Sequence, residues 1–402
     1  MTSAVVTGLG IAAPNGLGTD DYWKAVLEGR SGIGSVTRFD ASGYPSSLAG
    51  EVPGFDAAEH LPGRLLPQTD HMTRLALATA EWALDDAEVD IEELPEFSAG
   101  VITASSSGGY EFGERELRNL WFKGAAHVSA YQSFAWFYAV NTGQISIRHK
   151  LRGPTGVLVG DQAGGADALA HARRQIRKGT ALMISGGIDG SLCSWGWIAH
   201  LASGRVSTGD DAARAYRPFA ADADGHVPGE GGALLVIEGE HLAKARGARI
   251  YGSIAGHAAT IDPAPGSGRP STLENAVRGA LADAEVRPEE VDVVFCDGAA
   301  VPELDRIEAE AVNKVFGVGA VPVTVPKTMT GRLFSGAVSL DVATALLSIR
   351  DGLVPPTIGV DVAEDHGMDL ITGSARNLPV RTALVIARGL GGFNSALVVR
   401  AA

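Results

Sequence analysis

Apolar and polar positions along the chain follow two alternating patterns. Short apolar runs bounded by turn residues predict buried strands, and apolar residues spaced three and four apart predict helices. Strands are expected at residues 4–8, 100–103, 157–159, 181–186, 232–238, 291–296, 382–388 and 395–400. Helices are expected at residues 76–87, 166–178, 273–284 and 340–349. This alternation predicts an α/β fold.

The same strand and helix pattern starts again near residue 249, so we expect two α/β halves, residues 1–248 and residues 249–402. No obvious sequence repeat joins them. Stretches rich in Gly, Pro and Ser at 41–53, 222–232 and 262–272 predict loops. Residues 389–392 carry three glycines and predict a tight hairpin between the last two strands.

Composition narrows the class of protein. The chain has 402 residues, is 45% hydrophobic and has a formal charge of −14, so it is expected to be globular and to bind neither nucleic acid nor an anionic membrane surface. No apolar run approaches the ~20 residues of a membrane-spanning helix. The basic run Arg173, Arg174, Arg177 and Lys178 is interpreted as a solvated helix face.

Only two cysteines, Cys193 and Cys296, are present. Two are too few for a disulfide framework, and neither has a cysteine or histidine neighbour at metal-ligand spacing. We therefore expect both to be small buried apolar residues in a protein of the reducing cytoplasm. No metal and no cofactor is expected.

Candidate chemistry lies in residues 156–170, where an apolar strand, a glycine-containing turn and a helix start follow one another. A helix N-terminus lowers the pKa of a thiol and stabilises a developing oxyanion. The residue placed there is Gln162, whose carboxamide cannot attack a thioester. The pattern thus indicates a nucleophile site that lacks its nucleophile.

This segment, together with residues 5–16 and 389–399, resembles the β-ketoacyl synthases, condensing enzymes of the thiolase fold in which a cysteine stands where Gln162 stands here. The resemblance implies a thiolase-like fold, with two duplicated α/β halves in a five-layered αβαβα arrangement. Asp161-Gln-Ala-Gly-Gly165 and the aromatic block 133–148 are similar to the chain-length factor, the β subunit of bacterial type II polyketide ketosynthases.

Two histidines of the condensing enzymes also have substitutes here. By the resemblance, Asp297 and Arg332 occupy their positions, whereas Lys327, Pro302 and Asp305 are kept. An aspartate accepts hydrogen bonds and carries the wrong charge to stabilise an enolate, and an arginine guanidinium does not cycle protons. We expect Asp297 and Arg332 to form a structural ion pair, and no catalytic residue is expected.

Residues 110–121 place Tyr110, Gly113, Leu117 and Trp121 on one face of a helix. Such a stripe alone predicts a face packed on the core, and Gly113 could serve close helix packing. The resemblance implies instead that Tyr110, Gly113 and Leu117 close the far end of a polyketide tunnel. The small side chains at 113 and 117 favour a product longer than an octaketide.

Phe134, Trp136, Phe137 and Tyr138 concentrate aromatic side chains in a chain that is only 6% aromatic, which predicts a packed interface or core patch. The resemblance implies that this segment and the strand after it pair with a catalytic ketosynthase α subunit in a heterodimer. An acyl carrier protein would then deliver the growing polyketide chain through that heterodimer.

Three functions remain open from the sequence. The first is a non-catalytic subunit that sets the length of poly-β-ketone chains made from malonyl carrier protein. The second is a malonyl-carrier-protein decarboxylase that supplies the acetyl primer through Gln162, although such decarboxylases keep the histidines. The third is a stand-alone thiolase-fold protein that binds an acyl ligand in the vacant cavity.

Overall fold

The computed structural model describes residues 2–360 and 366–402. Its strands lie in two halves with the same order. In the N-terminal half, β6 (Thr155–Leu158), β5 (Ala99–Ala104), β7 (Leu182–Asp189), β8 (Gly231–Gly239) and β1 (Ala4–Ala13) are neighbours in that order. In the C-terminal half the order is β11 (Pro322–Thr324), β10 (Val293–Phe295), β15 (Thr382–Arg388), β16 (Phe393–Arg400) and β9 (Gly252–Ile261). The equivalent order is the structural signature of a duplication.

Strand direction also matches between the halves. In each half three strands are parallel, β5, β6 and β7 in one and β10, β11 and β15 in the other. The remaining two strands of each half run antiparallel to their neighbours. The halves meet where β1 pairs with β9 at Val5–Ser253 and Val6–Gly252, which joins all these strands into one 12-stranded sheet. That sheet also contains β13 (Asp369–Leu370), beside β11, and β2 (Gly16–Leu17), which pairs with β1 off the main strand order.

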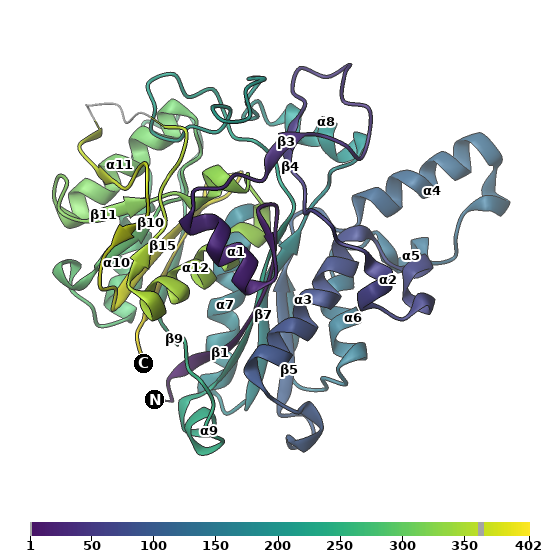
Figure 1. Ribbon diagram of the computed structural model, residues 1–402, viewed down its shortest axis with the longest axis horizontal. Helices are drawn as coiled ribbons and strands as arrows, with labels where there is room; N and C mark the ends of the chain where they lie inside the picture. Colours follow the sequence, from purple (N-terminus) through teal and green to yellow (C-terminus); the bar gives the residue numbers. More distant parts are fainter. Residues whose placement is uncertain (1, 361–365) are drawn as a thin grey trace.

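Helices fill three layers around these strands (Figure 1). The buried central layer is formed by α7 (Asp161–Arg177) and α12 (Ala337–Asp351), whose side chains join one hydrophobic cluster with strands of both halves. Outside the N-terminal half lie α3 (His71–Ala87) and α6 (Val140–Arg148), and outside the C-terminal half lie α10 (Leu273–Asp283) and α11 (Pro302–Phe316). The five-layered αβαβα architecture expected of a thiolase-like fold is therefore confirmed.

Glycines set the spacing between two of these layers. A Cβ at Gly8 or Gly10 of β1 would collide with the backbone of α3 at Ala83 or Thr79. All ten residues of β1 are buried, as expected of a strand covered on both faces. Close packing of α3 on β1 thus explains why small residues interrupt an otherwise apolar strand.

The remaining elements lie at the edges and surface. They are α1 (Thr19–Leu27), β3 (Ile33–Ser35), β4 (Leu48–Gly50), α2 (Ala57–His60), α4 (Tyr110–Lys123), α5 (Gln132–Ala135), α8 (Ser194–Ala202), α9 (Glu240–Ala245), β12 (Leu353–Val354) and β14 (Arg376–Asn377). Short 3-10 turns complete the chain at Gly63–Gln68, Ile91–Glu93, Ala125–His127, Pro288–Glu290, Pro326–Met329 and Phe334–Gly336.

Two sequence-based expectations need correction. Residues 41–53 are not wholly a loop, because β4 pairs with β3 there in a short antiparallel ladder. Arg173 is not solvated: it is buried, pairs with Asp283 and donates to the carbonyl of Ala255, whereas Arg174, Arg177 and Lys178 are more open to solvent. The α7 face at Arg173 packs on β9, so its charge is neutralised inside the protein.

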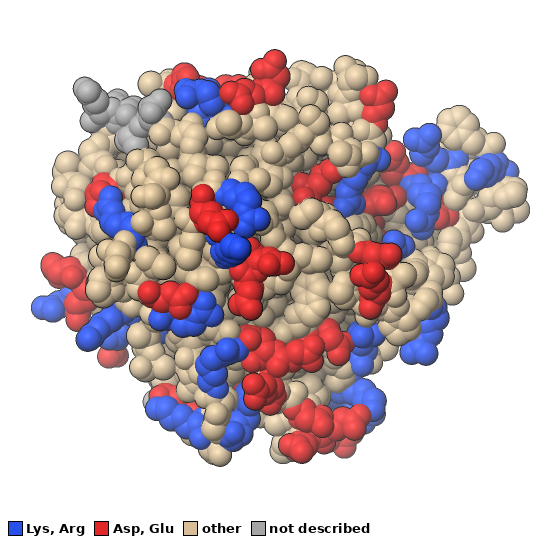
Figure 2. Space-filling view, viewed as in Figure 1, with Lys and Arg blue, Asp and Glu red and all other residues tan. Residues whose placement is uncertain are grey.

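Acidic and basic side chains are interspersed over the face shown in Figure 2. Among the residues that the structure describes, no helix is both long and apolar enough to cross a membrane.

Candidate functional site

Gln162 is the second residue of α7, directly after the turn that leaves β6. The helix begins at Asp161, five residues before the predicted start, because Gly164 and Gly165 weaken the helical signal in the sequence. A Cβ at Gly165 would lie 2.6 Å from the carbonyl oxygen of Ser335, so glycine is required for the helix to approach that segment. Residue 162 is thereby held at the positive end of a buried helix.

The Gln162 side chain is fully buried and points at a carboxylate. Its Nε2 donates to Oδ1 of Asp297 at 2.5 Å, whereas its Oε1 has no hydrogen-bond partner among the described residues. The carboxamide is thus fixed by a residue 135 positions away in the chain.

Asp297 and Arg332 form the ion pair that the sequence predicts. Arg332 Nη1 and Nη2 each lie 3.1 Å from Asp297 Oδ2, and both residues are buried. Burial alone lowers the pKa of Arg332, but the Asp297 carboxylate raises it well above its usual value. A guanidinium in that state stays charged and cannot transfer protons.

The backbone around this pair completes the network. Asp297 Oδ1 also accepts from the Arg388 N–H at 2.9 Å, and Arg332 Nη2 donates to the Arg388 carbonyl at 2.6 Å. The Asp297 N–H donates to Glu308 Oε1 at 2.6 Å. Burial, followed by the Asp297 charge, raises the pKa of Glu308 to about 7. Sequence reasoning missed Glu308, because nothing in its helical context distinguishes it from a surface residue.

Lys327 is buried with Asp341 on α12 as its counter-ion, at 2.5 Å, and its Nζ donates to the Cys296 carbonyl at 2.7 Å. Burial raises the pKa of Asp341 to about 6, against the opposing effect of Lys327. This pair ties the central helix layer to the end of β10, next to Asp297.

Two cavities lie on either side of Arg332 and Arg205, which line both of them. One of about 510 Å³ is lined by Asp297, Arg332, Arg388 and the hairpin at residues 389–392. The other, of about 90 Å³, is lined by Asp161, His200 and His226, and shares Arg332 and Arg205 with the first. Burial lowers the pKa of His200 to about 4 and that of His226 well below its usual value, so both imidazoles are neutral.

Helix α4 protrudes from the body of the molecule (Figure 1). The stripe expected on it does not face the core along its whole length, because Leu117 is 40% exposed and Trp121 is 79% exposed, while Gly113 is buried. The outer half of the stripe is therefore an apolar surface without a covering layer in the single chain.

Trp195, at the start of α8, closes the inner half of that stripe. Its ring stacks on Tyr110 with centroids 4.7 Å apart and planes 9° from parallel. A Cβ at Gly113 would lie 3.2 Å from Cζ3 of Trp195 and 3.7 Å from Cβ of Trp136. Gly113 thus accommodates the indole of Trp195, a residue that sequence reasoning did not connect with α4.

The aromatic segment after α4 is also open to solvent in the single chain. Trp136, Phe137 and Tyr138 are exposed, whereas Phe134 is half-buried and packs on the core beneath α3. The next strand, β6, is the edge strand of the N-terminal half. An exposed aromatic patch and an unpaired strand edge are both features of interaction surfaces.

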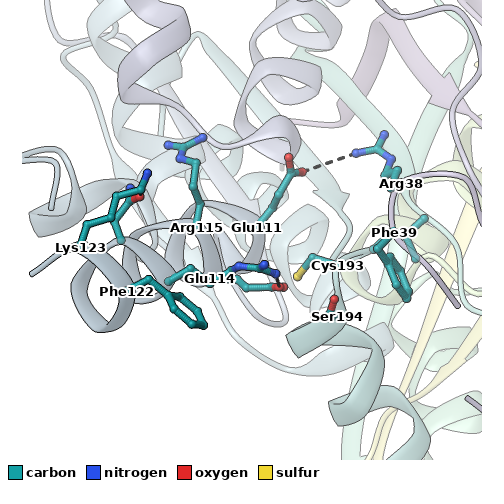
Figure 3. A pocket seen from close by; sticks show the side chains of 12 residues that line it. Arg38, Phe39, Glu111, Glu114, Arg115, Phe122, Lys123, Cys193 and Ser194 are labelled. Atoms are coloured by element: carbon teal, nitrogen blue, oxygen red, sulfur yellow. Dashed lines mark hydrogen bonds and ion pairs between the residues drawn. The ribbon is translucent and has the colours of Figure 1, made fainter. Parts of the chain in front are cut away.

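The opposite side of α4 lines a cleft of about 610 Å³ with α8 and residues 38 and 39 (Figure 3). Arg38 lies 3.6 Å from Glu111 across it.

Cys193 lies at the inner wall of this cleft, and burial raises the pKa of its thiol to about 12. Cys296 is fully buried and its pKa is also raised by burial, so neither thiol is favoured as a thiolate. Within the described residues, no cluster of three or more His, Cys, Asp or Glu side chains could hold a metal.

Comparison with known proteins shows the family of the chain. The family model for the β-ketoacyl synthase N-terminal domain matches residues 1–243, and that for the C-terminal domain matches residues 251–361. An actinorhodin polyketide putative β-ketoacyl synthase 2 of Streptomyces coelicolor is 60% identical over 99% of this chain and 98% of its own length. The tetracenomycin polyketide synthase ketoacyl synthase beta subunit of Streptomyces glaucescens is 60% identical over 98% of each chain.

Solved structures agree as well. The ishigamide ketosynthase/chain length factor is 26% identical, with a TM-score of 0.90 over 100% of this chain and 99% of that one. A type II polyketide synthase ketosynthase, solved with its acyl-carrier protein and a hexaketide, gives a TM-score of 0.89 at 26% identity over 100% of this chain and 99% of that one. The chain therefore belongs to the β-ketoacyl synthase family, and within it to the ketosynthase β subunits, or chain-length factors, of type II polyketide synthases.

Proposed function

We propose that this chain is the non-catalytic, chain-length-determining subunit of a type II polyketide ketosynthase. It pairs with a catalytic ketosynthase α subunit, which makes poly-β-ketone chains from malonyl carrier protein in the cytoplasm. The observation that carries the proposal is the buried network of Gln162, Asp297 and Arg332. A nucleophile and two proton-handling groups are replaced by residues whose polar groups bind one another.

The surface around α4 to α6 supports the pairing. Five apolar side chains of α4 and the segment after it are exposed, and β6, the next strand in the chain, is an edge strand; the five are Leu117, Trp121, Trp136, Phe137 and Tyr138. Burying aromatic side chains of this size is a main source of binding energy at protein interfaces. A partner that pairs with β6 would also cover the outer half of α4 and enclose a tunnel between the subunits.

Within that tunnel, Tyr110, Gly113 and Leu117 form the gate, and Trp195 contributes to it through its stack on Tyr110. Among the three gate residues of α4, Leu117 is the one whose side chain is exposed, and it is open to the proposed tunnel. A leucine at that position leaves more room than an aromatic ring, which favours a product longer than an octaketide.

The alternative, decarboxylation of malonyl carrier protein through Gln162, finds less support in the site. Asp297 carries negative charge where a donor to the developing enolate is needed, and it binds the Gln162 amide that would have to contact the substrate. The neutral histidines of the small cavity contact neither Gln162 nor Asp297 by a hydrogen bond within the described residues.

A reconstituted assay separates the functions. Malonyl-loaded carrier protein is incubated with this chain alone, with a cognate catalytic ketosynthase alone, and with both, and products are followed by mass spectrometry. Product only in the combined sample supports the proposal. Acetyl carrier protein formed by this chain alone, and lost in Gln162→Ala, would establish the decarboxylase instead. Acyl binding by a chain that never pairs with the ketosynthase would identify a stand-alone binding protein.

A further inference from the structure

Asp161, the first residue of α7, adopts a left-handed backbone conformation with φ of +51°. L-residues rarely adopt this conformation, and Asp and Asn tolerate it best among those with side chains. The turn into α7 therefore favours aspartate or asparagine at position 161, directly before Gln162.

The polar groups of Asp161 bind two segments far away in the sequence. Its Oδ2 accepts from the N–H of Leu390, in the hairpin between β15 and β16, at 2.6 Å. Its carbonyl oxygen accepts from Oγ of Ser335 at 2.9 Å. The hairpin also packs closely on the turn, because a Cβ at Gly389 would lie 2.9 Å from the Gly160 carbonyl oxygen. Asp161 thus fastens the hairpin to the start of α7.

The Asp161 carboxylate lies in the first turn of α7, at the end of the helix that favours negative charge. Backbone N–H groups and the helix dipole converge at a helix N-terminus and favour anions. The Leu390 N–H donates its hydrogen bond to the Asp161 carboxylate at this end of α7, so it is not free to bind another anion. Asp161 also lines the cavity of about 90 Å³ together with Arg205 and Arg332. Burial and the neighbouring Arg332 lower the pKa of Arg205, and the Asp161 carboxylate opposes that shift.

We propose that Asp161 is an internal anion that fills the anion-stabilising position at the start of α7, and that it excludes a thioester oxyanion or a malonyl carboxylate from the site. The exclusion is independent of the missing nucleophile. A cysteine restored at position 162 would remain a poor nucleophile while Asp161 is present, because the adjacent carboxylate disfavours a thiolate.

The proposal for Asp161 rests on the proposed function, but its test measures the reactivity of a thiol and not the length of a polyketide. A negative result in one test therefore does not decide the other. Three variants of the full chain are compared in complex with the catalytic ketosynthase: Gln162→Cys, Asp161→Asn with Gln162→Cys, and Asp167→Asn with Gln162→Cys. Iodoacetamide is the probe, and the alkylated peptide is quantified by mass spectrometry from pH 6 to pH 10. The wild-type chain is the blank.

Asparagine tolerates the left-handed conformation and keeps an acceptor for Leu390, so Asp161→Asn removes the charge alone. The control Asp167→Asn removes a carboxylate farther along α7, where Asp167 binds Ser395. The other charged or titratable groups around the site are the same in all three proteins, namely Asp297, Arg332, Arg205, His200 and His226.

We expect the thiol introduced by Gln162→Cys to react about tenfold faster at pH 7 when Asp161 is replaced by asparagine, which corresponds to a pKa lower by about one unit. The Asp167 control should match the single variant Gln162→Cys. Equal rates and equal pH profiles with aspartate and with asparagine at position 161 would overturn the proposal.

A second measurement needs no engineered thiol. Hydrogen exchange of the Leu390 amide is compared between the wild-type chain, Asp161→Asn and Asp161→Gly. Glycine fits the backbone conformation but offers no acceptor, so we expect faster exchange at Leu390 in the glycine variant only. Unchanged exchange in Asp161→Gly would show that the carboxylate does not hold the hairpin.

Discussion

Arg332 and Asp297 lie 35 residues apart in the chain, yet two guanidinium nitrogens of Arg332 lie 3.1 Å from the same carboxylate oxygen of Asp297. The other oxygen of that carboxylate accepts the carboxamide of Gln162 at 2.5 Å. The three residues that we propose to stand in place of a cysteine and two histidines therefore interact as a set.

The pair makes a prediction about stability. Asp297→Ala leaves Arg332 buried without a counter-charge and should lower the free energy of unfolding by about 3–5 kcal/mol. Asp297→Leu combined with Arg332→Met should recover most of that loss, because two apolar side chains need no counter-charge. Urea denaturation of the three proteins measures both effects. A double variant as unstable as Asp297→Ala would contradict this explanation.

Buried carboxyl groups predict how stability changes with pH. Burial raises the pKa of Asp305 to about 8 and that of Glu308 to about 7. Both groups hold a proton more tightly in the folded chain than in the unfolded chain, where carboxyl groups titrate near pH ~4. Their stabilising contribution is complete below that pH and is lost as pH rises through 7 and 8.

We therefore expect the urea midpoint to fall as pH rises from about 5.5 to about 8.5, and Glu308→Gln to reduce that fall. The glutamine cannot accept from both the Asp297 and the Gly298 N–H groups as well as a carboxylate does, so its overall stability should be lower. A midpoint that rises with pH over this interval would refute the assignment.

Trp121 tests the proposed heterodimer surface. It is 79% exposed, so Trp121→Ala should leave the stability of the single chain unchanged. Loss of an aromatic side chain at the centre of an interface weakens the free energy of binding by about 2 kcal/mol, which raises Kd about 30-fold. Val318→Ala, which alters a residue 77% exposed on the other half of the chain, is the control. Analytical ultracentrifugation with the ketosynthase gives Kd, and equal values for both variants would place the interface elsewhere.

Trp195 tests the composition of the gate. Trp195→Ala removes the ring that stacks on Tyr110 and fills the space beside Gly113. We expect the heterodimer to make a longer product, which mass spectrometry of the extracted polyketides detects. Ile198→Ala, an exposed change on the same helix, should leave the length unchanged. A product of unchanged length from Trp195→Ala would remove this residue from the gate.

Many strands and helices of the fold could be predicted from the sequence, because the buried strands of an α/β protein are continuous apolar runs. The predicted strand 382–388 matches β15 in both bounds, and the predicted helix 273–284 ends one residue beyond α10. The Asp297–Arg332 pair was also predictable, since two opposite charges at neighbouring positions of a buried site need each other.

Contacts between distant segments were not predictable. Trp195 reaches α4, and Asp161 reaches Leu390 at a separation of 229 residues, only after the chain folds. Glu308 lies closer in the chain, 11 residues from Asp297, but the sequence does not show that its carboxylate turns back to the Asp297 N–H. Arg173 illustrates the same limit, because helical periodicity places it beside exposed basic residues while β9 and Asp283 cover it. A single sequence carries no signal for such pairs.

Product length is the most direct test of the central claim that this chain sets length without catalysing condensation. Leu117 is the cleanest position, because it is 40% exposed on the proposed tunnel face, whereas a larger residue at Gly113 would collide with Trp195. The mass of the polyketide made by the ketosynthase with the wild-type chain is compared with that made with Leu117→Phe. The account predicts a shorter product at an unchanged heterodimer Kd. The same carbon count from an intact Leu117→Phe heterodimer would contradict it.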